Sequence, residues 1–362
     1  MARQASKKRQ VRAGIKTIKA KPRPKVKPRT RKVKRHKPAL QNVRQSRFSS
    51  LNEVLLHNIL KGDDTQKVSE EALLILQAPT SITNNMRDLS FREGFSIGKV
   101  LYGICAYYNP KSWYEEYILE LARFFEKAGY GGTTYTIFPD KIAFEIYGKE
   151  LNLGANMHSF EAGVLSGFIT SARGSYTHLQ EIDCRCNGAK SCSFSTLLQP
   201  SDRLQPQPKT TELMQNLAAH INSVAIEKKG PTPSFSDYYY ALLLHNLLAR
   251  QYVQSFKSVF SFLGESMLKQ KRQSSKPINA AYIEKVLKLL HLGDPRIESI
   301  RPIKAKIIFN RLSSKRDLVE LSVDFLGGLL GELSKNTIAT ESSTAGGYAL
   351  RLHSEAARRT HK

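Results

Sequence analysis

The chain has 362 residues, of which 41% are hydrophobic, so it can bury the core of one or two globular domains. Its formal net charge is +25, and 19 of its Lys and Arg residues lie among the first 50 positions, where no Asp or Glu occurs. No apolar run reaches the roughly 18 residues that cross a bilayer, and no apolar segment follows the charged start. We therefore expect a cytoplasmic location, with neither a membrane-spanning helix nor a secretory signal.

The basic N-terminal segment is predicted to be a disordered tail over residues 1–46. Between residues 21 and 38 cations alternate with prolines; the like charges repel, and proline lacks the donor that a helix needs. Such an arm displaces counterions from phosphates, which predicts non-specific nucleic-acid binding, and without an aromatic residue before Phe48 it offers no base stacking. An anionic membrane surface or a merely solubilising role are the alternatives. The cations assigned to nucleic acid are Lys21, Arg23, Lys25, Lys27, Arg29, Arg31, Lys32, Lys34, Arg35 and Lys37.

A first folded domain is predicted over residues 47–198, because apolar periodicity begins near its start. Its first helix carries an apolar face over 54–60, the run 72–76 reads as a buried strand, and a second helix is expected over 91–104. The clearest helix runs from Ser112, a plausible N-cap, to Ala128, and Gly129 follows its end.

Two hairpins and one helix complete this predicted domain. The first hairpin spans 133–147 and turns at Pro139-Asp140. A helix rich in small residues follows over 158–171, then a strand over 176–181 and a second hairpin turning at Asn187-Gly188. This order predicts the α+β class, with a mostly antiparallel sheet packed by helices.

The C-terminal half is predicted to repeat this fold. Residues 199–236 read as a linker with one helix, 237–353 as a degenerate second copy, and 354–362 as a short tail. Leu243–Leu248 echoes Leu55–Leu60, and Phe325–Leu333 echoes Phe160–Phe168. We therefore expect an internal duplication.

The cysteines carry the main chemical signal. Three of the four lie between Cys184 and Cys192, which is no disulfide framework and points toward metal or redox chemistry. With His158 and Glu181 these thiols make a complete tetrahedral set for zinc. Buried cysteines without a metal are the plain alternative, since free cysteine often packs as a small hydrophobe. We favour zinc.

The segment from His158 to Phe194 resembles the 4-vinyl reductase domain. The diagnostic ending of that family, E-x-x-C followed by G and then C-x-F, stands here as Glu181, Cys184, Gly188, Cys192 and Phe194. The family is named from a bacteriochlorophyll biosynthesis protein and includes the aromatic-sensing domains of phenol-responsive bacterial regulators. Its fold is shared with vesicle-tethering subunits.

This resemblance implies a structural zinc site and a small-molecule pocket. In the zinc-containing sensors an upstream Cys, a Glu and two further Cys bind the metal; His158 stands in the place of the first, and Cys186 is an extra thiol that could replace Glu181. In the second copy Val323 stands where His158 would, so no metal is expected there. The ligand is expected to be apolar or aromatic. The candidate pocket residues are Tyr102, Tyr107, Trp113, Phe144, Phe160 and Phe168.

No motif in the sequence supports catalysis, since it has neither a glycine-rich phosphate loop nor a nicotinamide or flavin fingerprint. We therefore expect a non-catalytic small-molecule-binding protein with a nucleic-acid-binding arm, possible regulatory use and possible homodimers. The alternative is a scaffolding protein whose paired domains form an interaction surface and whose pocket is vestigial.

Overall fold

The structure is a computed structural model that describes residues 50–62, 64–138, 141–196, 209–226, 233–248, 253–273, 278–292, 295–301, 304–309, 316–331, 337–344 and 347–354. Among these residues, side chains are described only between 50 and 292 and between 320 and 330. The predicted tail, with every cation assigned to nucleic acid, lies outside them. No helix in the described part is long and apolar enough to cross a membrane.

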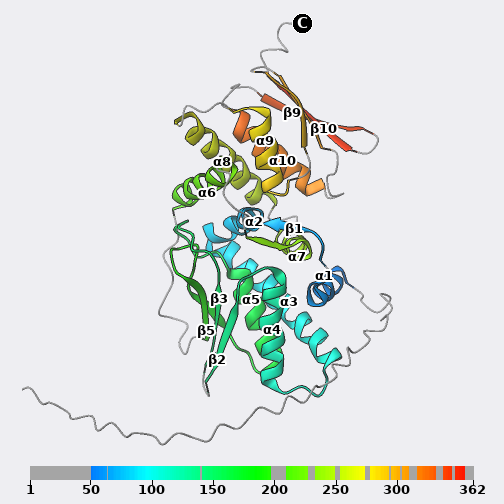
Figure 1. Ribbon diagram of the computed structural model, residues 1–362, viewed down its shortest axis with the longest axis vertical. Coiled ribbons are helices and arrows are strands. Elements are labelled where there is room, and N and C mark those ends of the chain that lie inside the picture. The colour runs from blue at the N-terminus through cyan, green and yellow to red at the C-terminus, as the bar shows by residue number, and fades with distance from the viewer. Residues whose placement is uncertain are drawn as a thin grey trace, which may run out of the picture. The chain divides into compact units, whose positions relative to one another are not determined.

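The elements confirm the α+β class, and they come in two successive sets. The first set is α1 (Leu51–Lys61), β1 (Lys67–Ser69), α2 (Glu70–Ile82), α3 (Asn84–Tyr108), α4 (Tyr114–Ala128), β2 (Thr133–Ile137), β3 (Ile142–Tyr147), α5 (Ser159–Arg173), β4 (Leu179–Asp183) and β5 (Ser191–Thr196) (Figure 1). The second set is α6 (Thr210–Ile226), β6 (Ser234–Ser236), α7 (Asp237–Leu247), α8 (Val253–Gln273), α9 (Ala280–Leu289), β7 (Pro295–Arg301), β8 (Lys304–Phe309), α10 (Arg316–Gly331), β9 (Thr337–Thr344) and β10 (Gly347–Ser354).

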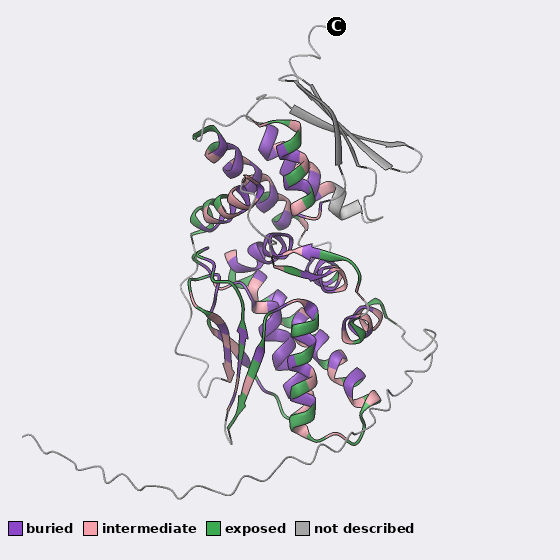
Figure 2. Cartoon of the chain, viewed as in Figure 1, coloured by how far each residue is buried: buried purple, intermediate pink, exposed green. Residues whose placement is uncertain are grey.

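The two sets have the same order of helices and strands, and their sheets have the same topology. The first sheet runs β2-β3-β5-β4 and the second β7-β8-β10-β9, with every neighbouring pair antiparallel. In the first set α4 and α5 contact the sheet and α3 packs on α5, so that α5 is almost entirely buried (Figure 2). In this order the second set begins at α6, the helix that was predicted to lie in a linker. The predicted domain bounds stay a prediction.

Strands β1 and β6 join the two sets in a symmetric way. Val68 lies opposite Phe235 at the centre, and the flanking pairs are Lys67 with Ser236 and Ser69 with Ser234. Exchanging the two strands reproduces the same pairs, which is the mark of an isologous contact. Outside the pairing, the Glu70 N–H donates to Pro233 O (3.0 Å) and the Asp237 N–H to Gln66 O (3.3 Å), again as equivalent bonds. The chain therefore contains an internal pseudo-dimer.

Close packing of glycines repeats in both sets. A Cβ on Gly94 of α3 would lie 2.0 Å from Phe160 O, and one on Gly264 of α8 would lie 2.3 Å from Phe325 O. Phe160 and Phe325 are the residues that begin the two similar sequence segments of α5 and α10. The α8–α10 pair therefore reproduces the α3–α5 pair.

Three local predictions were wrong. Residues 72–76 belong to the helix α2, because Ser69 caps its first turn and it is buried nearly all round; an apolar run this short cannot be told from a buried strand by periodicity. Helix α4 begins after Trp113, not at Ser112. The similar segments Leu55–Leu60 and Leu243–Leu248 lie on α1 and at the end of α7 with its C-cap, and these two helices hold different places in the two sets.

Candidate metal centre and adjoining groove

An irregularity in strand β4 brings an acid and a thiol to the same face of the sheet. In a regular strand Glu181 and Cys184, three residues apart, would point to opposite faces. Glu181 pairs with Phe194 but Asp183 pairs with Ser193, so the register shifts by one residue between them. This bulge places Cys184 level with Cys192, on the inner side that Glu181 also faces.

His158 reaches the same place through the segment that precedes α5. The Leu151 N–H donates to Arg185 O at 2.8 Å, the Leu153 N–H to Cys186 O at 2.7 Å, and the Gly188 N–H back to Leu151 O at 3.0 Å. These bonds tie the segment before α5 to the turn after β4. Gly188 has a φ of +83°, a left-handed conformation that glycine adopts without strain. As the N-cap of α5, His158 then stands over the strand ends.

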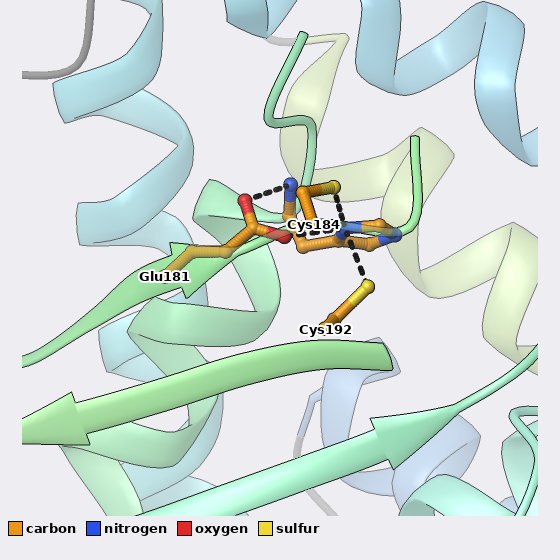
Figure 3. Close-up of side chains that lie close together, drawn as sticks. Glu181, Cys184 and Cys192 are labelled. Atoms are coloured by element: carbon orange, nitrogen blue, oxygen red, sulfur yellow. Dashed lines mark hydrogen bonds and ion pairs between the residues drawn. The ribbon is translucent and has the colours of Figure 1, made fainter. Parts of the chain in front are cut away.

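The four predicted ligand residues converge. One ligand atom from each of His158, Glu181, Cys184 and Cys192 lies within 4.8 Å of all the others, and all four residues are buried. His158 Nδ1 lies 2.8 Å from Glu181 Oε1, 3.3 Å from Cys184 Sγ and 3.5 Å from Cys192 Sγ. Figure 3 shows Glu181, Cys184 and Cys192 pointing toward one another. This group could hold a metal ion.

The ionisation of these side chains is shaped by their burial. Burial raises the pKa of the Cys184 thiol, and the hydrogen bond that the Cys192 thiol donates to Cys184, together with burial, raises the pKa of Cys192. Burial by itself lowers the pKa of His158, but the two thiols and the Glu181 carboxylate outweigh it, so that the pKa of His158 is raised well above its ordinary value. Metal binding requires the thiolate forms, so a bound cation would displace protons from the thiols.

Zinc fits this donor set. Tetrahedral zinc with nitrogen and sulfur ligands separates those ligand atoms by roughly 3.5 Å, which matches the two sulfur–nitrogen distances here. The contact between His158 and Glu181 has the length of a hydrogen bond, so these two side chains would have to move apart when a metal ion binds. The backbone N–H of His158 also donates to Glu181 Oε2 (3.2 Å), which holds the carboxylate in place.

Cys186 is buried but is not one of the four converging residues. The Cys186 carbonyl accepts a hydrogen bond from the segment before α5. Its neighbour Arg185 forms a buried ion pair with Glu70 at the start of α2. The turn between Cys184 and Gly188 is thereby fixed to the element that follows the pseudo-dimer strand β1.

A groove of about 700 Å³ adjoins this centre. One wall is the face of α3 that carries Arg87, Phe91 and Arg92. The other side is lined by Tyr176 and His178, which precede β4, and by Leu179–Glu181 of β4, and Ala162 of α5 also contributes. Glu181 therefore belongs both to the metal group and to the groove.

The six predicted pocket residues lie elsewhere and do not line this groove. Phe144, Phe160 and Phe168 are fully buried core residues, and Tyr102 packs edge-on against Phe168. Trp113 and Tyr107, at 78% and 58% exposed, lie in and beside the connection between α3 and α4. A pocket formed by these six residues stays a prediction.

A buried polar network escaped the sequence analysis. Oε1 of Glu161, fully buried on α5, accepts hydrogen bonds from Gln77 Nε2 and from the Tyr239 hydroxyl, each at 2.7 Å, and from the Tyr130 hydroxyl. Burial, followed by the Glu161 charge, raises the pKa of both tyrosines well above the ordinary value. The network ties α5 to α2 and to α7 of the second set. The sequence signal for this network is the acid Glu161, which stands inside the apolar run FEAGVLSGF.

Comparisons with protein-family models, with curated proteins and with solved structures find no match for this chain.

Proposed function

We propose that the chain is a non-catalytic small-molecule-binding protein of the 4-vinyl reductase type, in which a structural zinc ion fixes one wall of the ligand groove. The observation that carries the proposal is the double placement of Glu181, in the buried metal group and on the groove wall. Four protein ligands leave no open position for a water nucleophile, which favours a structural over a catalytic metal.

The metal would act on the shape of the site. His158 is the N-cap of α5, Glu181 ends the regular part of β4, and Cys192 belongs to β5, so the ion would hold a helix start against two strands. Two thiolates and one carboxylate around a divalent cation leave a single negative charge, and the buried imidazole completes the set. Loss of the ion would release the end of β4 and with it that wall of the groove.

The test is elemental analysis and native mass spectrometry of the full chain, purified without added metal. We expect one zinc ion per chain, and a second population whose extra mass corresponds to a small organic molecule released on denaturation. A chain that holds less than about a tenth of an equivalent of any divalent metal, and that gains none on addition of zinc, contradicts the proposed metal.

The basic arm is proposed to bind nucleic acid without sequence preference. Removing residues 1–45 should abolish binding to a random 30-base-pair duplex while the circular dichroism spectrum of the remainder stays unchanged. If about half of the cations engage phosphates, log Kd against log salt has a slope of roughly 8 for the full chain. Binding that survives the deletion, or a flat salt dependence, contradicts this role. Vesicles with anionic lipid, run in parallel, test the membrane alternative.

A further inference from the structure

We propose that the groove binds a planar aromatic ring that carries a carboxylate, with Arg87 and Arg92 holding the carboxylate. This inference rests on the proposed small-molecule function and names the chemical class of its ligand. It differs from the apolar ligand that the sequence resemblance implies, because the groove walls combine cations with aromatic rings.

Two guanidinium groups line the groove, and neither forms an ion pair in the described part of the chain, although the charge of Arg92 acts on the neighbouring Glu93 carboxylate. Arg87 is half-buried, and its Nη2 donates to Ser81 O at 3.4 Å; Arg92 is exposed, and its Nε donates to Asp88 O at 3.4 Å. Each side chain is thus tethered by one bond to a backbone carbonyl, and donors remain. A guanidinium presents its donors as a planar fork that matches both oxygens of a carboxylate.

The acidic residues of the groove do not offset the preference of the two arginines for a carboxylate ligand. Asp88 is exposed, so water screens its charge, and the described residues include no ion pair to it. Glu181 is buried, the backbone N–H of His158 donates to its Oε2, and Nδ1 of the His158 ring lies 2.8 Å from its Oε1. Among Arg87, Arg92 and Asp88, the half-buried Arg87 is therefore the charge that water screens least.

The aromatic side chains lie on the same walls. The Phe91 and His178 rings line the groove and are in direct contact, with centroids 4.6 Å apart and an interplanar angle of 33°, so they form one continuous aromatic surface. Tyr176, which is 70% exposed, packs against Phe95 with centroids 5.9 Å apart. Burial lowers the pKa of His178, so its imidazole is neutral near pH 7 and offers a flat face rather than a competing charge. Rings of this kind accept a further ring in offset or edge-to-face geometry.

The dimensions of the groove agree with a ligand of one or two rings. Its volume of about 700 Å³ lies within the range of roughly 300–1,000 Å³ typical of small-molecule sites. Ala162 contributes a small side chain to the groove lining, and Phe91 lies between the two arginines along α3. A ring against Phe91 would therefore place its carboxylate within reach of a guanidinium at either side.

The experiment separates ring from charge with three probes. Isothermal titration calorimetry on the full chain compares 2-naphthoate, the uncharged 2-naphthylmethanol with the same rings, and acetate. We expect saturable binding of 2-naphthoate, at least tenfold weaker binding of the alcohol, and none of acetate. Arg87→Gln should weaken 2-naphthoate binding by roughly ten- to a hundredfold, the loss expected for a charge-assisted pair, and Arg92→Gln should weaken it less, because Arg92 is exposed.

Arg123→Gln is the matched control, because Arg123 is an arginine on α4 that pairs with Glu120 and does not line the groove. It should leave binding of 2-naphthoate unchanged, and thermal melting should show that the variants fold. Equal binding of acid and alcohol, weakened by Phe91→Ala but not by Arg87→Gln, overturns the anion assignment while the small-molecule function stands. If neither probe binds, both proposals fall.

Discussion

Replacing both Cys184 and Cys192 with serine is expected to abolish zinc binding and to lower the free energy of unfolding by about 4 kcal/mol. This is the stabilisation that a ligand supplies at a thousandfold above its Kd when only the folded state binds it. For a chain of 362 residues the loss corresponds to a fall in Tm of roughly 5 °C, because the entropy of unfolding is about 2.1 cal/mol/K per residue. Differential scanning calorimetry with and without a chelator measures it: the chelator should lower the Tm of the parent chain and leave that of the variant unchanged.

Cys186→Ser is the internal control for this experiment. Cys186 is as buried as the other two thiols and lies two residues from Cys184, but it is not one of the four converging residues. The substitution therefore reports the cost of burying a hydroxyl, about 1–3 kcal/mol, without loss of metal. If Cys186→Ser loses the metal and Cys184→Ser keeps it, the ligand set is wrong.

Gly98→Ala is expected to lower the free energy of unfolding by about 3 kcal/mol or more. A Cβ at this position of α3 would lie 2.1 Å from Val164 O and 2.7 Å from the Phe168 backbone nitrogen, so the backbones of α3 and α5 must move apart. No rotamer change relieves a clash with backbone atoms. Because residues of both helices line the groove, binding of any groove ligand should weaken with it. Chemical denaturation gives the stability change.

Gly103→Ala, on the same helix, makes the same chemical change where it meets no neighbour. No atom lies within 4 Å of a Cβ built there, and the residue is exposed. Alanine should raise the stability of the helix by about 1 kcal/mol, because it has the higher helix propensity. Opposite signs for the two variants are expected; two changes of equal sign and size would contradict the close packing.

Local patterns predicted most of the first set of elements. The first hairpin, the small-residue helix and the strong helix before Gly129 follow from turn residues, caps and periodicity, and each is present with ends shifted by a few residues. The second hairpin differs, because its first strand is β4 itself and the predicted strand at Cys184–Cys186 is part of the turn. The run at 72–76 failed because burial on all sides removes the periodicity that separates helix from strand. The helix there is specified by Ser69 and the two glutamates that follow it.

The metal group was predictable from residue types and the sequence resemblance, but its geometry was not. Glu181 and Cys184 share a face only through the bulge in β4, and no residue pattern announces a register shift of one position. The groove was missed for another reason. Its aromatic residues, Phe91 and His178, come from two elements far apart in sequence, and the pocket prediction instead took the most conspicuous aromatics, three of which fill the core.

The symmetric joining of β1 to β6 has a consequence for the number of sites in a functional unit. Two identical subunits must carry identical sites in pairs, so any change in one is copied into the other. Here the halves are encoded separately, and cysteine does not occur after residue 192. One half can therefore keep the thiols while the sequence of the other half changes independently. Because both halves belong to one chain, they stay paired one to one at any dilution.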